Sequence, residues 1–205
     1  MPEHLTINPS TLYFGTPVVL IVTNNPDGTP NITPMSSAWA LGRSVVLGLG
    51  ATGQGTANLQ QSGECTLNFP SARLWQNVEA IAPTTGSIPV PHEKANMGYR
   101  YEADKFALGG FTQRQSAMVS PPCIQECPLQ FEARLLARHE SASKSNDRAS
   151  SHLLFEVEII RVHAHRDILI PETSHINTEL WNPLHYVFRH YFGNAQDLGK
   201  NFRAR

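Results

Sequence analysis

The sequence has few cysteines, no surplus of either charge and no long apolar run. Its 205 residues include three cysteines, 16 Lys+Arg and 17 Asp+Glu, which gives a formal net charge of −1. Three thiols cannot all pair within one chain, and the lack of basic excess argues against a nucleic-acid partner. The apolar run at 18–22 is far shorter than the ~20 residues that span a bilayer, and no secretion signal is visible. We therefore predict a cytoplasmic protein with no disulfide and no membrane association.

Short β-prone runs separated by turn residues make up most of the chain. Each run is bounded by Gly, Pro, Asn or Asp, and the later ones alternate apolar with polar residues, which is typical of half-buried strands. We expect strands within 17–23, 29–39, 44–50, 64–69, 129–136 and 153–163. Short helices are expected at 56–62, ended by Gly63, and at 101–108. The predicted fold is mainly β, a β-barrel with a few short helices, and we expect residues 1–205 to form one domain.

Three stretches do not read as regular elements. Residues 80–101 carry three prolines and two glycines, so they predict a long excursion, which is often functional. Residues 141–151 are small and polar and predict a hairpin loop. Residues 180–205 are rich in aromatic side chains, so this segment should pack on the barrel or on a partner subunit.

The stretch at 31–41 combines a proline with small hydroxyl residues, which a simple strand does not require. Pro34 donates no backbone hydrogen bond, and Ser36, Ser37 and Ala38 would let a flat ring approach the main chain. An isoalloxazine has an acceptor-rich edge that suits backbone N–H donors. The same residues also fit an irregular edge strand whose serines cap a bulge, and these residues alone leave both interpretations open.

Five segments of the chain, in their order along the sequence, resemble the flavin-reductase-like family. This family includes flavoredoxins and the reductase components of two-component flavin monooxygenases. The segments are NITPMSSAW at 31–39, LGLG at 47–50, NLQQSGECTLNFP at 58–70, DKFALGGFT at 104–112 and PCIQECPL at 122–129. Each is weak alone, whereas their order and spacing are specific. The resemblance covers most of the chain and implies an FMN-binding split barrel.

The resemblance also implies where the cofactor lies. Residues 33–39 would run along the isoalloxazine, the strand end at 49–50 would lie beside it, and the turn before the short helix would bind the phosphate. A helix N-terminus favours an anion there, although N-capping would need only one of the hydroxyls. The implied FMN-binding residues are Thr33, Pro34, Met35, Ser36, Ser37, Ala38, Trp39, Leu49, Gly50, Thr52, Gln54, Thr56, Asn58 and Asn68.

The chain departs from the family in the phosphate turn. Family members commonly carry a basic residue there, whereas this turn reads Gly53-Gln54-Gly55. Lys105 or Arg43 could supply the charge, although such residues more often lie solvated at the surface. Asn68, late in a buried strand, needs a partner, which is either the flavin or a plain hydrogen bond within the sheet.

Three other motifs give weaker indications of function. His163 and His165 share a strand face, which fits a metal site or a nicotinamide-side position, yet no acidic or cysteine ligand stands at matching spacing, so we expect no metal. Cys123 and Cys127 lack a second cysteine pair and read as packing residues. The GxGxxG at 48–53 lacks the acidic residue and the βαβ pattern of a Rossmann fold.

The predicted function is that of an oxidoreductase in which bound FMN takes a hydride from NADH or NADPH and passes electrons to free flavin, a monooxygenase or another acceptor. The chemistry belongs to the flavin, so no catalytic side chain is predicted. The alternative is a flavoredoxin-type FMN electron carrier without direct NAD(P)H activity, and a haem-binding barrel is a weaker third. By resemblance, and because the aromatic tail has apolar area to bury, we expect a homodimer.

Overall fold

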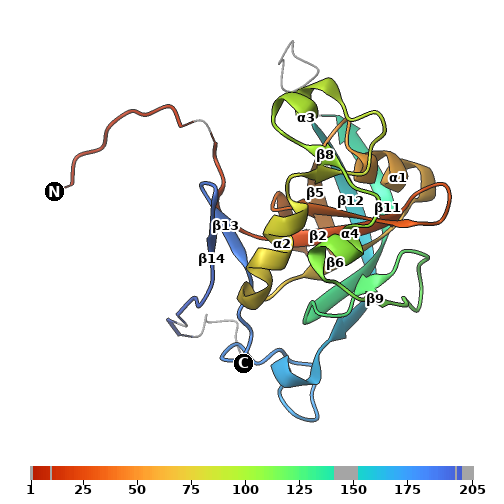
Figure 1. Cartoon of the computed structure of the whole chain (residues 1–205). Coiled ribbons are helices and arrows are strands. Elements are labelled where there is room, and N and C mark those ends of the chain that lie inside the picture. The colour runs from red at the N-terminus through yellow and green to blue at the C-terminus, as the bar shows by residue number, and fades with distance from the viewer. Residues whose placement is uncertain (1, 10, 141–151, 197, 200–205) are drawn as a thin grey trace.

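A curved antiparallel sheet of seven strands forms the body of the protein (Figure 1). The computed structural model describes residues 2–9, 11–140, 152–196 and 198–199. The predicted hairpin loop at 141–151 lies outside the described residues. In spatial order the sheet contains β3 (Pro30–Met35), β2 (Val19–Asn24), β6 (Glu64–Phe69), β11 (Leu129–Glu140), β12 (His152–Ala164), β5 (Ser44–Gly50) and β4 (Ala38–Leu41).

The two edges of this sheet are consecutive in the chain. β3 ends at Met35 and β4 begins at Ala38, so only Ser36 and Ser37 connect one edge to the other. The sheet must therefore curl until its edges approach, and Ser37 extends the β4–β5 pairing by one position, because Gly48 N–H donates to Ser37 O at 2.8 Å. Because no ladder joins β3 to β4, the barrel is closed by a bent link and remains split there. The expectation of a mainly β split barrel is confirmed.

β2 is buried on both faces because it separates two cores. Alternate residues of a strand point to opposite faces, so Val19 and Ile21 enter the barrel interior while Leu20 and Val22 face outward. The outer core is covered by helix α2 (Trp75–Ile81), helix α4 (Lys105–Gly109) and part of the C-terminal segment. This arrangement explains why the sequence at 18–22 is an unbroken apolar run.

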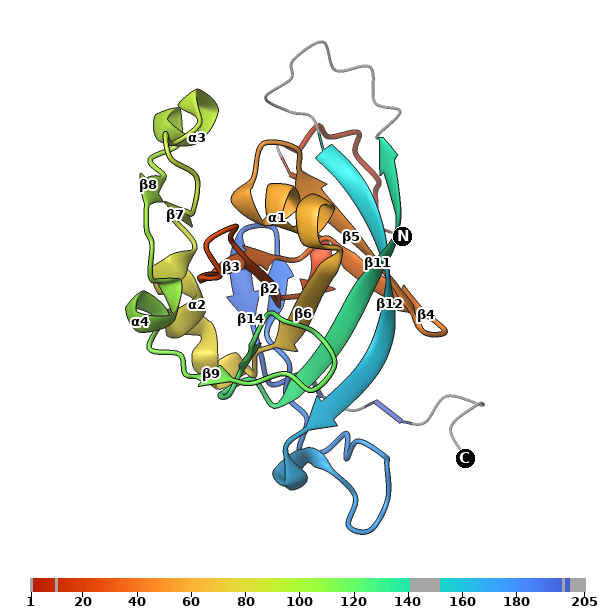
Figure 2. The ribbon, with the colours of Figure 1, turned by 90° about the vertical axis from the view of Figure 1, so that its right-hand side faces the viewer.

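Helix α1 (Gln54–Ser62) follows β5 and packs against β2 and β3 (Figure 2). Its predicted end is correct, since Gly63 adopts a left-handed φ of 68°. Residues 80–101, expected to lack regular structure, contain β7 (Thr84–Thr85), α3 (His92–Asn96) and β8 (Arg100–Tyr101), so that expectation is wrong in detail. Other short elements are η1 (Ala72–Leu74), β9 (Gln113–Arg114), β10 (Cys123–Ile124) and η3 (Arg166–Ile168).

The aromatic C-terminal segment folds back on the barrel. It forms the hairpin of β13 (His185–Val187) and β14 (His190–Phe192), and β13 pairs with β1 (Phe14–Pro17). Figure 1 shows this hairpin beside α2. Beyond β14, Gly193 lies so close to η1 that a Cβ there would come 2.2 Å from the Ala72 Cβ. Among the described residues, no helix has the length and apolarity needed to cross a bilayer.

Candidate functional site

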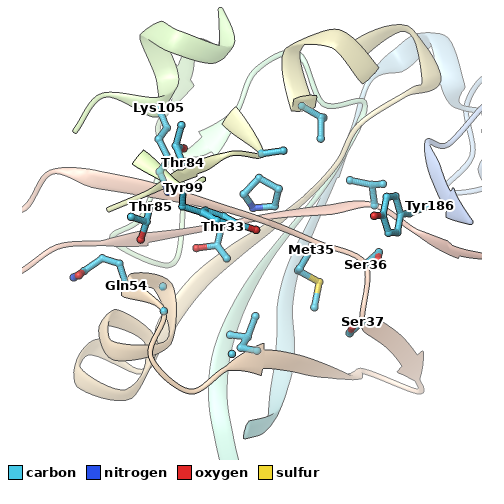
Figure 3. Close-up of a pocket in the computed structure, with 18 of the residues that line it drawn as sticks. Thr33, Met35, Ser36, Ser37, Gln54, Thr84, Thr85, Tyr99, Lys105 and Tyr186 are labelled. Carbon is cyan, nitrogen blue, oxygen red and sulfur yellow. The ribbon is translucent and has the colours of Figure 1, made fainter. Parts of the chain in front are cut away.

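A cavity of about 570 Å³ opens at the split of the barrel, within the ~300–1,000 Å³ typical of cofactor sites. Its floor comes from the β3–β4 link, the end of β5 and the start of α1, and its walls come from segments distant in sequence. In Figure 3, Lys105, Thr84, Thr85 and Gln54 gather at one end, whereas Ser36, Ser37 and Tyr186 lie at the other. The cavity is therefore elongated and chemically different at its two ends.

The link at Ser36 and Ser37 forms one end of the floor. β3 is an edge strand, so backbone groups on its outer side have no partner within the sheet, and Pro34 offers no N–H there. Ser37 donates from Oγ to the Tyr13 hydroxyl at 3.3 Å. A Cβ on Gly48 would come 3.1 Å from the Ser37 Cβ, so glycine lets β5 approach the link more closely than a larger residue would without a small shift of Ser37. The result is a small-residue shelf bordered by Met35.

The first turn of α1 forms the floor at the opposite end. Gly53 is the N-cap and provides no side-chain cap, so the free amides of Gln54 and Gly55 have no partner within the helix. Gly55 packs directly on β3, because a Cβ there would lie 2.3 Å from Thr33 Oγ1. The positive end of the helix dipole thus faces the cavity, which favours a bound anion.

Two lysines add positive charge at this end. The Lys94 ammonium lies 3.8 Å from where a Gly53 Cβ would stand, beside the α1 N-terminus, and burial lowers the pKa of Lys94. Lys105 is only 3% exposed and donates from Nζ to Ile32 O at 2.8 Å. Burial first, and repulsion by Lys94 second, lower the pKa of Lys105 to about 8. The ion pairs among the described residues include neither lysine.

Aromatic side chains form a wall near the shelf. Tyr13 and Tyr186 meet edge to face with ring centroids 5.4 Å apart, and Tyr186 lies 5.7 Å from Tyr191. The Tyr191 hydroxyl donates to Glu79 at 3.0 Å, and burial together with this carboxylate raises its pKa. Glu79, the acidic residue of the cavity lining, is thus engaged by a tyrosine. The two lysines and Arg189 leave the lining with a cationic excess.

The structure brings nine of the fourteen predicted site residues to the cavity. These are Thr33, Pro34, Met35, Ser36, Ser37, Leu49, Gly50, Gln54 and Thr56. Ala38 and Trp39 instead lie on β4, where Trp39 is 60% exposed, and Thr52 is exposed in the turn before α1. Arg43 bonds Ile159 O on the barrel and does not line the cavity, whereas Lys105 does and is buried, not a solvated surface residue.

The two predicted asparagines are held by protein partners. Asn58 donates to Thr23 Oγ1 at 3.1 Å and to Asn25 Oδ1 at 2.9 Å, and it accepts from Gln54. Asn68 is fully buried, where it donates to Leu20 O at 3.1 Å and accepts from Ile124 N–H at 2.8 Å. Of the two interpretations of Asn68, these contacts match the hydrogen bond within the sheet.

His163 has an acidic partner that the sequence spacing did not indicate. Its Nε2 lies 2.6 Å from Glu132, which is fully buried on the neighbouring strand β11. Ala117 and Met118 donate their backbone N–H groups to the same carboxylate at 2.8 and 2.6 Å. Neither His163 nor His165 lines the cavity. Glu132, paired with His163, therefore holds the loop at 115–122 against the barrel through hydrogen bonds, and His163 takes no part in the cavity.

Several cavity residues were missed by the sequence reasoning. Thr84, Thr85, Lys94 and Tyr99 all belong to the excursion at 80–101, and Glu79 precedes it. The length of that excursion was the signal that it carries function, but no pattern within it pointed to particular residues. Tyr186 and Tyr191 belong to the aromatic tail, whose packing was predicted without its place at the cavity.

Comparison with known proteins identifies the family. A model described as "Flavin reductase like domain" matches residues 11–195. The chain belongs to the flavin-reductase-like family. Among curated proteins, the uncharacterized protein YdfE of Bacillus subtilis (strain 168) is 41% identical over 198 residues, which cover 97% of this chain and 93% of that protein.

Solved structures show the same fold for this flavin-reductase-like chain. Flavoredoxin from Methanosarcina acetivorans superposes with a TM-score of 0.77 at 17% identity, covering 99% of this chain and 97% of that one. Flavoredoxin of Desulfovibrio vulgaris (Miyazaki F) gives 0.76 at 22% identity, with 100% and 99% covered. Nitrilotriacetate monooxygenase component B from Bacillus cereus gives 0.75 at 14% identity, with 98% and 100% covered. At these identities the likeness concerns the fold.

Proposed function

We propose that this flavin-reductase-like chain binds FMN in the cavity and works as an oxidoreductase that passes a hydride from NADH or NADPH to the bound flavin and electrons onward to an acceptor. The observation that carries the proposal is that one cavity contains both an anion-binding end and a shelf of small residues suited to a flat ring. Riboflavin lacks the phosphate that the lysine end would hold, so the phosphorylated flavin fits the cavity better.

Different residues would bind the phosphate and the ring of FMN. The phosphate would be held by Lys105, Lys94 and the first turn of α1. Two ammonium groups and the free amides of the helix N-terminus lie close together there, so a bound anion would relieve the repulsion between their positive charges. Thr84 and Thr85 are buried at the same end. The shelf from Thr33 to Ser37 would support the ring, with Tyr13 and Tyr186 excluding water from its side.

When bound, FMN supplies the hydride and electron chemistry, so the protein needs only to hold it, tune it and leave it accessible. We assign no catalytic side chain. The tyrosines that line the cavity have raised pKa values where a shift is resolved, as at Tyr186, where burial is the main cause. Tyr186 and Tyr191, whose pKa values are raised, are thus protonated at neutral pH, and Tyr191 donates its hydroxyl hydrogen to Glu79.

The first experiment is a titration of the purified full-length protein with FMN and with riboflavin. Free and bound flavin differ in fluorescence, so the titration gives both dissociation constants. FMN should bind at least about tenfold more tightly, since one charge-assisted hydrogen bond contributes about 1.5–3 kcal/mol. Equal affinities would contradict phosphate binding at the lysine end of the cavity. If neither flavin binds, the whole proposal is overturned.

The second experiment tests the reductase activity. Holoprotein mixed anaerobically with NADH or NADPH in a stopped-flow instrument should lose the flavin absorbance near 450 nm. If neither nicotinamide bleaches the flavin, the reductase function fails while FMN binding stands. The second candidate, an FMN electron carrier, would then apply; the observation that favours it is that the aromatic C-terminal segment contributes Tyr186 and Tyr191 to the cavity lining.

We also propose that the protein is a homodimer. The edge strand β4 leaves Trp39 60% exposed and Leu41 75% exposed. Such apolar groups on an open sheet edge are typical of a surface that a partner covers. Light scattering should give twice the chain mass, and Leu41→Asp should shift the protein to monomer. A wild-type monomer at micromolar concentration would refute the proposal.

A further inference from the structure

A second cavity of about 420 Å³ lies against the first. It is formed where the C-terminal hairpin meets η1 and α2, and Figure 1 shows these elements side by side. Glu79, Arg189 and Tyr191 line both cavities, so these three side chains form the partition between them. Trp75, His190 and Phe192 line the second cavity but not the first.

The hairpin turn that carries Arg189 has a strained backbone. Val187 pairs directly with His190, so Phe188 and Arg189 alone make the turn, with φ of 43° and 70°. Two-residue turns with both central residues at positive φ favour Asn-Gly, because larger side chains crowd the backbone there. Such outliers persist only where surrounding structure imposes them, and they gather at functional sites. Here the donation of Phe188 N–H to Tyr13 O at 2.7 Å holds the turn.

The guanidinium of Arg189 has no hydrogen bond or ion pair within the described part of the chain. The nearest acidic group of the partition, on Glu79, accepts the Tyr191 hydroxyl instead. A guanidinium presents a planar set of donors that matches a carboxylate or phosphate in two parallel hydrogen bonds. The strained turn thus presents an unpaired anion-binding group at the boundary of two cavities.

Trp75 provides a flat apolar surface beside this group. It begins α2, is 45% exposed, and its ring centroid lies 6.3 Å from that of Tyr191 with an interplanar angle of 43°. Trp75 lines the second cavity and is partly exposed, so its indole offers aromatic surface on which a third ring can stack. An exposed tryptophan at an open cavity with a free arginine is a combination that recognises a planar ring bearing an anionic group.

We propose that the second cavity binds a planar ring with an anionic substituent, held by Trp75 and Arg189, as part of the second reactant that meets the flavin. The assignment to the second reactant rests on the proposed function, whereas the binding site itself rests on the second cavity alone. Two sources carry this chemistry: the adenosine phosphate half of a nicotinamide dinucleotide and a free aromatic carboxylate. In either case Glu79, at the partition, can accept a hydrogen bond from a ring amino or hydroxyl group.

Calorimetric titration of the full-length protein, saturated with FMN to occupy the first cavity, tests the site. The probes are adenosine 5′-monophosphate and salicylate. Binding of the first alone assigns a nucleotide, binding of the second alone assigns an aromatic carboxylate, and binding of both supports the shared chemistry. Arg189→Gln and Trp75→Ala should each weaken binding at least tenfold, and Trp75→Phe should restore most of it. Arg138→Gln, an exposed arginine on β11, is the matched control and should leave binding unchanged.

Failure of both probes to bind, or binding that survives both substitutions, would overturn the proposal. Arg189→Gly gives a second readout, because glycine adopts positive φ without strain. It should raise the midpoint of thermal unfolding while abolishing probe binding, and a lowered midpoint would contradict the strained turn. If the protein takes up no FMN yet binds a probe in an Arg189-dependent way, the flavin proposal fails and the second cavity stands.

Discussion

Lys105 should make FMN binding weaken in the alkaline range. Its buried ammonium has a pKa lowered from 10.5 to about 8, by burial and then by Lys94, against a smaller opposing effect of Glu102. Below pH 8 the free protein already carries the proton that the phosphate needs. Above pH 8 the free protein has lost it, whereas the bound phosphate dianion draws it back, so binding takes up a proton. FMN affinity therefore falls as the pH rises.

The size of the effect follows from the pKa. If bound phosphate restores an ordinary lysine pKa, the dissociation constant for FMN rises about tenfold between about pH 7 and pH 9, the slope approaching one decade per pH unit. Lys105→Met removes one charge-assisted hydrogen bond, worth about 1.5–3 kcal/mol, so affinity at neutral pH drops about 10- to 100-fold. The variant should also lose the pH dependence, because the titrating group is gone.

Fluorescence titrations at several pH values measure both quantities, with riboflavin as the matched ligand. Riboflavin carries the same ring and no phosphate, so its affinity should stay level over this range. The reasoning is refuted if FMN and riboflavin share one pH profile, or if the methionine variant keeps the slope of the wild type. A level FMN profile with intact discrimination against riboflavin would instead assign the phosphate to Lys94 and the helix amides.

Three further substitutions test the supports of the site. Gly55→Ala puts a Cβ 2.3 Å from Thr33 Oγ1, so thermal unfolding should show a loss of about 1–3 kcal/mol and FMN titration a weaker affinity. Asn68→Ala leaves Ile124 N–H and Leu20 O unpaired, so urea unfolding should show a loss of about 2–4 kcal/mol with FMN affinity preserved at low urea; a selective loss of flavin would restore its predicted flavin role. Burial raises the pKa of Glu132, but the bonds from Ala117, His163 and Met118 outweigh it and hold the pKa below the usual 4.5. Its stabilisation is therefore present above pH 4.5 and lost as the pH falls through the lower folded value, and Glu132→Gln should make the urea midpoint less sensitive to acid.

Local pattern was enough to locate most of the barrel strands, although the run expected at 29–39 is divided between β3 and β4 at opposite edges of the sheet. The predicted ranges 44–50 and 64–69 match β5 and β6 residue for residue, because each is a β-prone run ended by Gly or Pro. Helix α1 begins two residues earlier than predicted, at Gln54, since Gly53 caps it without a side chain and so leaves no capping signal. Helix α2 was missed, because its seven residues, WQNVEAI, are too few to establish a helical period.

The candidate site was predictable only where its residues are neighbours in sequence. Residues 33–37 and 49–56 form a continuous floor, and family-like motifs mark both. Lys105 could be judged buried only once β3 was known to offer Ile32 O to it across 73 residues. Likewise, Glu132 meets His163 because β11 and β12 are paired, a register that no spacing within one segment reveals.

The floor and the walls of the cavity have different structural origins, so they should contribute differently to function. The floor follows from the fold, since the sheet can close only by bending at Ser36 and Ser37, and that bend creates the shelf wherever the same topology occurs. The walls are contributed by the excursion at 80–101 and by the C-terminal hairpin, which are free to vary without disturbing the seven-stranded ladder. Flavin binding should therefore depend on floor and lysines together, whereas the choice of second reactant should depend on the hairpin. Changes at Arg189 should accordingly alter which molecule meets the flavin more strongly than they alter FMN affinity.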